Sequence, residues 1–344
     1  MIRRIFSGLT LSLMIGWAGV VLAADESMTT GYVQWDAGTK SGRWSWGNEA
    51  PLRVKEAALT WGVRKYEAPD SRINVILFPE LGMSLEVFDD GGKGLAPTLQ
   101  SEGIRAWVLQ RGDAVSGENS SHEVKVKEEE ALAQFVVSSL SAEKSGERWF
   151  LLGHGVGGGI VYRLLAANSR LNGVIALNVP FSSGGSTRAF RTFVEKVTAH
   201  QGRRVPWTTF LGTSMGKSTL GELLLGKGDF APEYAQPMDA ERLRSYLGDG
   251  LDSPTPFKNH WVKDLAAQPD IRALIFLGAH DGWSPPWQCD PTLFGLVRGN
   301  ITREHLTRAN GQATEYNHLD LLLGPNAKAD VFEPIVEWLG VTEP

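Results

Sequence analysis

A strand, a glycine-rich turn and a helix follow one another between residues 148 and 167, an order of elements that could present a nucleophile. The apolar run Trp149 to Leu152 is typical of a strand, and Ile160 to Ala167 is typical of a helix. Between them lies Gly153-His154-Gly155-Val156-Gly157, which matches a G-x-S-x-G turn except at its centre. In that turn the middle residue is a serine whose hydroxyl stands clear of the sheet. Position 155 is Gly, so the attacking side chain is missing.

An aspartate and a histidine occupy the later positions that such a nucleophile would need. Asp281 lies on a tight loop just after the apolar run Ile271 to Leu277, and His318 follows the run Ile301 to Thr307. A histidine can accept the proton of a hydroxyl group, and a carboxylate bonded to its ring fixes the tautomer. We therefore expect Asp281 and His318 to form a vestigial catalytic triad with Gly155 at the nucleophile position.

These segments resemble a bacterial α/β-hydrolase of the lipase/esterase type. The tail, from Asn317-His318-Leu319-Asp320 to Glu337-Trp338-Leu339, is also similar to polyhydroxyalkanoate-synthase-like and related lipase-like members. The resemblance covers about residues 58 to 339. It implies an α/β-hydrolase fold, with a mostly parallel central sheet flanked by helices and an inserted cap, and it implies carboxylic-ester hydrolysis as the family chemistry.

The chain departs from the family at the oxyanion site as well as at the nucleophile. The family usually has His-Gly after the strand that supplies an oxyanion donor, whereas this chain has Pro79-Glu80-Leu81. Pro79 has no N–H to donate, and Glu80 brings negative charge to a place where negative charge must develop. By the same resemblance, Leu81, His154 and Val156 belong to this oxyanion and pocket region. We expect a pseudoenzyme that binds an acyl-bearing or apolar small molecule, or a protein partner.

Hydrophobic patterning supports the same fold class independently of the resemblance. Strand and helix signals alternate, which favours a mostly parallel sheet covered by helices on both faces. Strands are predicted at 58–66, 73–78, 104–109, 149–152, 174–177, 271–277 and 301–307, and helices at 123–140, 160–167 and 331–339. The alternation stops in the segment 181–269, which we interpret as a cap inserted between two parts of one core, 58–180 and 270–344. Within it, short helices are predicted at 218–225 and 239–247.

The amino-terminal residues predict export and a small extension. Arg3 and Arg4, the apolar run Ile5 to Leu22 and a small-residue site ending at Ala23 are typical of a signal peptide over residues 1–23, which indicates a periplasmic or secreted protein. A retained signal anchor is the alternative, and no later segment is apolar enough to span a bilayer. Residues 24–57, with Trp35, Trp44 and Trp46, indicate a hairpin whose tryptophans pack against the main domain rather than bind sugars.

Composition excludes several other functions. The formal net charge is −5 and no basic face is apparent, so a nucleic-acid partner is disfavoured. Cys289 is the only cysteine, which excludes an internal disulfide and a cysteine-based metal site, and we expect it to be a buried packing residue. No cofactor and no metal are expected, and the oligomeric state stays open.

Three other interpretations of the same residues remain. Ser214 lies in a complete G-x-S-x-G, Gly212 to Gly216, but Pro206 interrupts the run before it and the segment falls in the predicted cap. A water activated by His318 could hydrolyse an ester directly, although this needs an oxyanion hole. Gly153, Gly155 and Gly158 satisfy a dinucleotide fingerprint, yet no acidic residue follows at the spacing that ribose binding requires.

Overall fold

The structure, a computed structural model, describes the larger part of the predicted core. The described residues are 28–36, 39–47, 58–80, 82–110, 126–143, 146–155, 157–168, 170–180, 204–205, 234, 238–239, 272–282, 284–290 and 300–341. The predicted signal peptide lies outside them, as does nearly all of the predicted cap. Within the cap segment the structure describes Tyr234 and a small antiparallel pair, β8 (Arg204–Val205) and β9 (Met238–Asp239).

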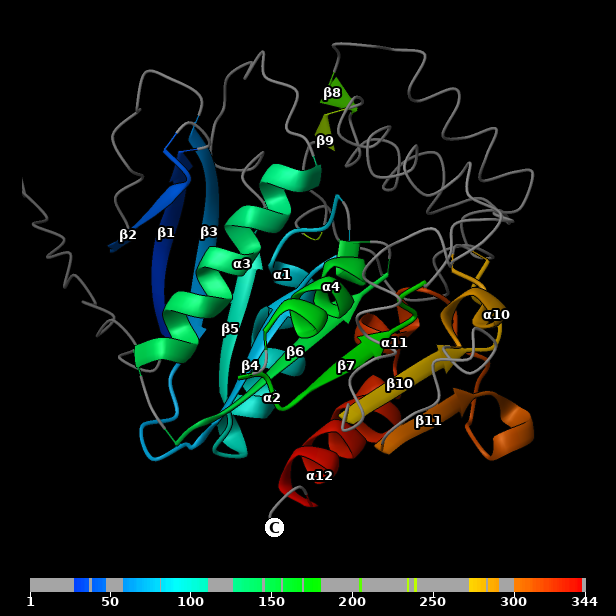
Figure 1. Ribbon diagram of the computed structural model, residues 1–344. Coiled ribbons are helices and arrows are strands. Elements are labelled where there is room, and N and C mark those ends of the chain that lie inside the picture. The colour runs from blue at the N-terminus through cyan, green and yellow to red at the C-terminus, as the bar shows by residue number, and fades with distance from the viewer. Residues whose placement is uncertain are drawn as a thin grey trace, which may run out of the picture.

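A nine-stranded sheet forms the centre of the molecule (Figure 1). In sheet order the strands are β11 (Asn300–Leu306), β10 (Arg272–Gly278), β7 (Gly173–Leu177), β6 (Arg148–His154), β4 (Ile73–Phe78), β5 (Arg105–Gln110), β3 (Ala58–Tyr66), β1 (Met28–Asp36) and β2 (Ser41–Trp46). The first six are parallel to one another, and the last three are joined antiparallel. The chain runs from β4 to β5 and then returns to the other side of β4 for β6. Ligand sites of open parallel sheets lie beyond the carboxyl ends of the strands at such a reversal.

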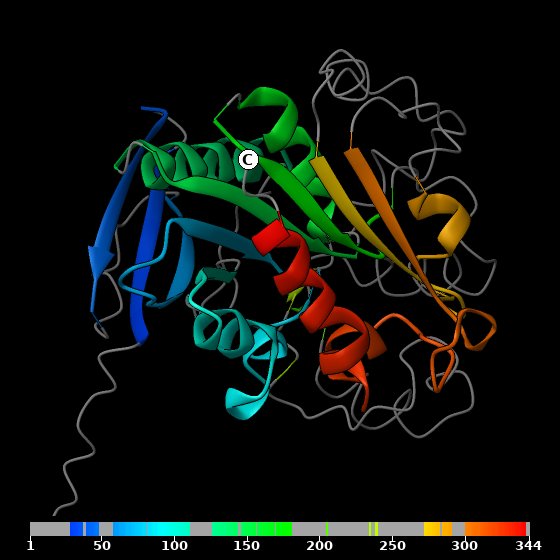
Figure 2. The same cartoon turned by 90° about the horizontal axis from the view of Figure 1, so that it is seen from below.

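Helices cover both faces of the parallel strands (Figures 1 and 2). One face packs against α3 (Val126–Glu143) and α4 (Ile160–Ala167) through residues such as Ile76 and Leu151. The other packs against α1 (Glu86–Asp89), α2 (Leu95–Ser101), α11 (Asp320–Leu323) and α12 (Glu333–Val341) through residues such as Leu77 and Leu152. Because neighbouring strand residues face opposite cores, the central strands are apolar throughout rather than alternating.

The predicted fold class is confirmed, and most element predictions agree with the structure. The strands over 58–66 and 73–78 and the helix over 160–167 match β3, β4 and α4 at both ends. The helix predicted over 123–140 begins and ends three residues later, and the closing helix includes a π-helical turn, Lys328–Phe332, before α12. Four described helices of only four to seven residues, α1, α2, α10 (Pro286–Cys289) and α11, are too short for a periodic signal. The helices predicted at 218–225 and 239–247 lie outside the described residues except for Asp239.

The amino-terminal hairpin packs against the core. β1 and β2 pair antiparallel, with Trp35 opposite Gly42. The rings of Trp35 and Trp44 lie 5.8 and 6.5 Å from that of Phe135 on α3. Trp46 lies 6.2 Å from Trp107 and keeps 49% of its surface exposed. These aromatic contacts tie the extension to helix and sheet alike.

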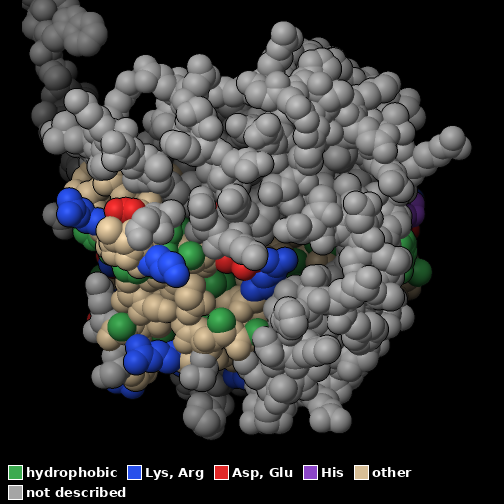
Figure 3. All heavy atoms as spheres, turned by 45° about the horizontal axis from the view of Figure 1, so that its top comes forward, with side chains coloured by type: hydrophobic (Ala, Val, Ile, Leu, Met, Phe, Trp, Pro, Cys, Tyr) green, Lys and Arg blue, Asp and Glu red, His purple; other side chains and the backbone are tan. Residues whose placement is uncertain are grey.

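The described part of the surface carries charges of both signs. On the face in Figure 3 the described Lys and Arg side chains stand apart from one another and do not form one continuous basic area. In the part of the chain that the structure describes, no helix has the length and apolar character needed to cross a membrane.

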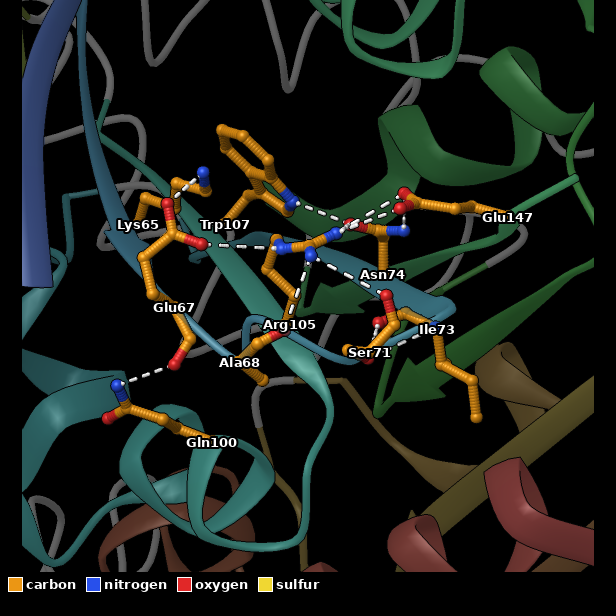
Figure 4. A network of polar contacts seen from close by, with 10 residues as sticks. All are labelled: Lys65, Glu67, Ala68, Ser71, Ile73, Asn74, Gln100, Arg105, Trp107 and Glu147. Carbon is orange, nitrogen blue, oxygen red and sulfur yellow. Dashed lines mark hydrogen bonds and ion pairs between the residues drawn. The ribbon is translucent and has the colours of Figure 1, made fainter. Parts of the chain in front are cut away.

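The amino-terminal ends of β4, β5 and β6 are joined by a buried arginine (Figure 4). Arg105, only 2% exposed, donates to Oδ1 of Asn74 at 2.9 Å, to Oε2 of Glu147 at 3.2 Å and to the carbonyl of Ala68 at 3.2 Å. Its Nε lies 3.4 Å from a carboxylate oxygen of Glu67. Two carboxylates and several neutral acceptors therefore offset the cost of burying this cation.

Replacing Arg105 by Ala should destabilise the fold strongly. The substitution leaves the carboxylates of Glu147 and Glu67 without their buried cation, which typically costs about 3–5 kcal/mol. Urea unfolding followed by circular dichroism measures the change. Arg303→Ala is the matched control, because Arg303 is more exposed in its pair with Asp290, and such surface pairs contribute about 0–1 kcal/mol. Equal losses in the two variants would contradict a structural role for the Arg105 network.

Candidate functional site

Four parallel strands deliver the predicted site residues to one edge of the sheet. Glu80 follows β4, Gly155 follows β6, Asp281 follows β10 and His318 follows β11. The carboxyl ends of parallel strands lie at the same edge, so residues from distant parts of the sequence meet there.

The turn at Gly155 has the sharp geometry of a nucleophile elbow. Gly155 has φ of 57°, a left-handed conformation that is costly for most side chains. A Cβ on Gly153 would lie 2.6 Å from the carbonyl oxygen of Gly158, and one on Gly158 would lie 2.5 Å from the carbonyl carbon of Gly153. Glycines at both positions are therefore needed for the strand and the following helix to approach so closely.

The carboxylate of Glu80 fills the space that a side chain at position 155 would take. A Cβ built on Gly155 would overlap Oε2 of Glu80 and would lie 2.6 Å from Cδ of Glu80 and 2.8 Å from Cε1 of His318. The strand register explains this placement. Phe78 of β4 pairs with Gly153 of β6, so Glu80 and Gly155, each two residues further on, emerge side by side.

Both oxygens of the Glu80 carboxylate are hydrogen-bonded although the residue is only 3% exposed. Oε1 accepts the backbone N–H of Gly157 at 2.9 Å, and Oε2 lies 3.1 Å from Nε2 of His318. Burial by itself raises the pKa of Glu80, but the hydrogen bond and positive charge of His318 outweigh it, so the pKa is lowered. Glu80 is a carboxylate anion held in place from both sides.

His318 lies between two carboxylates. Its Nδ1 is 2.7 Å from Oδ2 of Asp281, whose other oxygen accepts the N–H of Ser284 at 2.8 Å. Burial by itself lowers the pKa of His318, but Asp281 and then Glu80 outweigh it and raise the pKa to about 10. Both ring nitrogens therefore donate, and His318 is an imidazolium at neutral pH.

His154 supports the loop that carries His318. It is fully buried, its Nε2 lies 3.0 Å from the backbone carbonyl of His318, and the two ring centroids are 4.5 Å apart. Burial, followed by the positive charge of His318, lowers the pKa of His154 to about 3. A neutral His154 thus donates to the main chain behind the imidazolium.

The remaining predicted residues fall into two groups. Pro79 is buried directly after β4, and Cys289 is a buried thiol whose pKa is raised by burial and whose Sγ lies 3.4 Å from the carbonyl of Ser284. Leu81, Val156 and Ser214 lie outside the described residues. Among the residues that are described, no three His, Cys, Asp or Glu side chains are grouped so as to hold a metal ion.

Glu80 also bears on the dinucleotide interpretation. The N–H of Gly157, at the start of the helical segment after the glycine turn, already donates to Oε1 of Glu80, so it is not free to donate to a phosphate. A pyrophosphate bound at this turn would face a buried carboxylate at short range, and like charges repel strongly where water is excluded. The geometry therefore opposes dinucleotide binding.

One described residue of the insertion contacts the segment that follows Glu80. The hydroxyl of Tyr234 donates to Oδ1 of Asp90 at 2.5 Å, and its carbonyl accepts the N–H of Ser84 at 2.8 Å. Tyr234 is almost fully buried. Residue 234 is therefore fixed to the loop and helix immediately after the site-bearing turn.

The sequence alone identified Glu80 only as a charge that would oppose an oxyanion. The structure places its carboxylate where a side chain on Gly155 would lie and within hydrogen-bonding distance of His318. One signal in the sequence could have revealed this placement. Glu80 and Gly155 each lie two residues beyond a paired position of neighbouring parallel strands, Phe78 in β4 and Gly153 in β6.

Comparisons with solved structures find the same architecture. The soluble variant of monoglyceride lipase from Saccharomyces cerevisiae aligns with a TM-score of 0.61 and 14% identity, over 85% of this chain and 98% of the lipase. The bromoperoxidase from Bacillus anthracis aligns with a TM-score of 0.59 and 14% identity, over 84% and 98%. The esterase from Exiguobacterium antarcticum aligns with a TM-score of 0.57 and 13% identity, over 82% and 96%.

No protein-family model matches the sequence, and no curated protein matches it at the sequence level. The narrower likeness to polyhydroxyalkanoate-synthase-like proteins stays an expectation. Identities this low bear on architecture alone. The parallel sheet, the helices on its two faces and these structural matches together show that the chain has the α/β-hydrolase fold.

Proposed function

We propose that this chain is a pseudoenzyme of the α/β-hydrolase fold, inert toward carboxylic esters. The observation that carries the proposal is the carboxylate of Glu80 in the space of the missing nucleophile. An ester cannot be attacked from position 155, because Gly155 has no side chain and Glu80 occupies its place. Pro79 provides no N–H for the oxyanion that an attack on a carbonyl would create.

The protonation of His318 supports the same conclusion. With a pKa of about 10, His318 holds its proton at neutral pH and cannot accept another from a hydroxyl or a water. This argues against direct hydrolysis by a His318-activated water. It leaves Ser214, outside the described residues, as the remaining serine alternative.

The function left to such a protein is binding. In this proposal the ligand is an acyl-bearing or apolar small molecule, and a protein partner is the second candidate. The small-molecule ligand is supported by the kinds of protein that share the fold, which include a monoglyceride lipase in complex with a substrate analogue.

The proposal includes export, on the strength of Arg3, Arg4 and the apolar run that follows them. Mass spectrometry of the protein recovered from a bacterial host should find a chain that begins after Ala23. Recovery of an uncleaved chain in the membrane fraction would favour the signal anchor instead.

A fluorophosphonate probe tests the inert state directly. The wild-type protein should not be labelled and should not hydrolyse short- or long-chain acyl esters. Gly155→Ser alone should restore little, because the new Cβ overlaps Glu80 and because the raised pKa of His318 keeps the imidazole protonated at pH 7. Glu80→Ala/Gly155→Ser should be labelled at least about tenfold faster than Gly155→Ser, since it frees both the space and the imidazole.

Two controls make this result decisive. Ser214→Ala in the wild-type background should change nothing, and robust ester turnover that this substitution abolishes would overturn the proposal. Equal labelling of Gly155→Ser and the double variant would show that Glu80 does not block the position. Circular dichroism on every variant checks that each one is folded.

The raised pKa of His318 should make the free energy of unfolding depend on pH. The folded-state pKa of about 10 lies above the ordinary value of 6.5, so between these values the folded protein keeps a proton that the unfolded chain has released. The stabilisation is complete below about 6.5 and is lost as pH rises through about 10. The stability difference between wild type and His318→Gln, measured by urea unfolding, should therefore shrink across this interval. A constant difference would mean that Glu80 and Asp281 do not hold His318 protonated.

A further inference from the structure

The two edges of the described sheet differ in how well they are protected from pairing with another strand. At one edge, β11 presents the exposed side chains of Arg303 and His305. Side chains that carry charge are a common means by which proteins keep an edge strand from pairing with other chains. At the other edge, β2 carries a single charge, Arg43, together with Trp44 and Trp46. β2 is therefore the less protected edge.

Alternate residues of β2 direct their main-chain groups away from the sheet. The N–H of Gly47 donates to the carbonyl of Thr30 at 3.0 Å, one step beyond the pair formed by Gly31 and Trp46. Hydrogen-bonded and non-hydrogen-bonded pairs alternate along an antiparallel ladder. The N–H and C=O groups that point outward therefore belong to Gly42, Trp44 and Trp46. Among the described strands, none pairs with this side of β2 (Figures 1 and 2).

The side chains of β2 add an apolar surface to this edge. Trp44 and Trp46 share the face that α3 covers, and their rings are stacked with centroids 5.5 Å apart and an interplanar angle of 11°. Trp46 keeps 49% of its surface exposed. Arg43 and Ser45 lie on the opposite face, because side chains alternate along a strand, and both are exposed. A large aromatic surface and outward main-chain groups thus occur together at one edge.

Tryptophan lies opposite glycine twice within the hairpin. Trp35 pairs with Gly42, and Trp46 pairs with Gly31, where a Cβ on Gly31 would lie 2.5 Å from the Trp46 ring. A glycine leaves its main chain uncovered, and an aromatic ring on the facing strand can cover it. A second β2 strand, antiparallel to the first and with Trp44 opposite Trp44, would place Trp46 of each copy opposite Gly42 of the other. The pairing inside the hairpin would then be repeated between the copies.

Charge favours the same alignment. It places Arg43 of each copy opposite Ser45 of the other, so no two cations face each other. Centring the pair on Arg43 instead would put that residue opposite itself, and like charges directly opposite destabilise a strand pair. Centring it on Ser45 would leave Gly42 without a tryptophan opposite. The alignment centred on Trp44 satisfies both conditions.

We propose that two copies of this chain associate through β2, antiparallel and centred on Trp44, so that the two sheets continue as one. Such a pair has twofold symmetry, so the outward groups of each copy find their partners in the same three residues of the other. The inference goes beyond the proposed function and does not depend on it. β2 lies five positions from β6 in the order of the strands, so this surface is separate from the turn at Gly155.

Charge introduced at position 45 tests the alignment. Because Ser45 is exposed, its substitution disturbs little packing. Ser45→Arg sets like charges opposite each other at two symmetric places and should raise the dissociation constant of the dimer at least about threefold, whereas Ser45→Glu faces Arg43 and should lower it by about the same factor. Sedimentation velocity at a series of protein concentrations measures each constant.

Ser41→Arg is the matched control. It adds the same charge to the same face of the same strand, and Ser41 is exposed as well. In the proposed alignment, however, position 41 faces Gly47 of the other copy, which carries no charge. This variant should therefore associate almost as wild type does. The double variant Arg43→Glu/Ser45→Arg, which sets opposite charges across the interface again, should recover the association that Ser45→Arg loses.

Hydrogen exchange of the wild-type protein provides a measurement that needs no substitution. The amides of Gly42, Trp44 and Trp46 point outward in a single copy, so they should exchange more slowly at concentrations where the dimer forms. Unchanged exchange of the β2 peptide in a dimer would contradict the inference.

The oligomeric state decides between a second copy and other occupants of this edge. Wild-type protein that stays monomeric at every concentration would overturn the inference and would leave β2 to a strand of a different protein. A dimer weakened equally by Ser45→Arg and Ser41→Arg, or weakened by Ser45→Glu, would also overturn it. None of these results bears on fluorophosphonate labelling or ester turnover, so the proposed function stands or falls separately.

Discussion

The ion pair between Glu80 and His318 determines the charge and the shape of the candidate site. It joins two groups that are each almost completely buried, and each one makes the charge of the other tolerable. The carboxylate keeps the imidazole protonated, and the imidazolium keeps the carboxylate ionised in a place where burial alone would neutralise it. With Asp281, two carboxylates surround one imidazolium. The backbone N–H of Ser284 donates to Oδ1 of Asp281, and that of Gly157 donates to Oε1 of Glu80.

This pair exists because two neighbouring strands have the same register. β4 and β6 are paired so that Phe78 lies beside Gly153. Glu80 and Gly155 each follow two residues later, so they emerge side by side. Glycine at 155 then leaves a space at the elbow, and the side chain two residues beyond β4 is long enough to enter it. The glycine after β6 and the glutamate after β4 are thus complementary, because one leaves the space that the other fills.

The fold could be predicted from the sequence to a large extent, and the site only in part. The apolar runs that became β4, β6 and β10 are continuous because both faces are buried, which makes them easy to recognise. The order Gly155, Asp281, His318 followed from motif and strand placement, and the structure brings all three to one sheet edge. What could not be predicted is the direction of the Glu80 side chain, since it depends on the pairing between β4 and β6 and on the space beside Gly155. The short helices α1 and α11 escaped prediction because a single turn carries no periodicity.

The contacts of Tyr234 link one residue from a distant part of the sequence to the backbone next to the site. Its carbonyl and its hydroxyl both bind the stretch from Ser84 to Asp90, which begins only four residues after Glu80. A displacement of residue 234 would pull on the backbone that aims this carboxylate. The backbone that follows Glu80 is thereby held by a residue more than a hundred positions later in the sequence, so a change at Tyr234 would be felt next to the site.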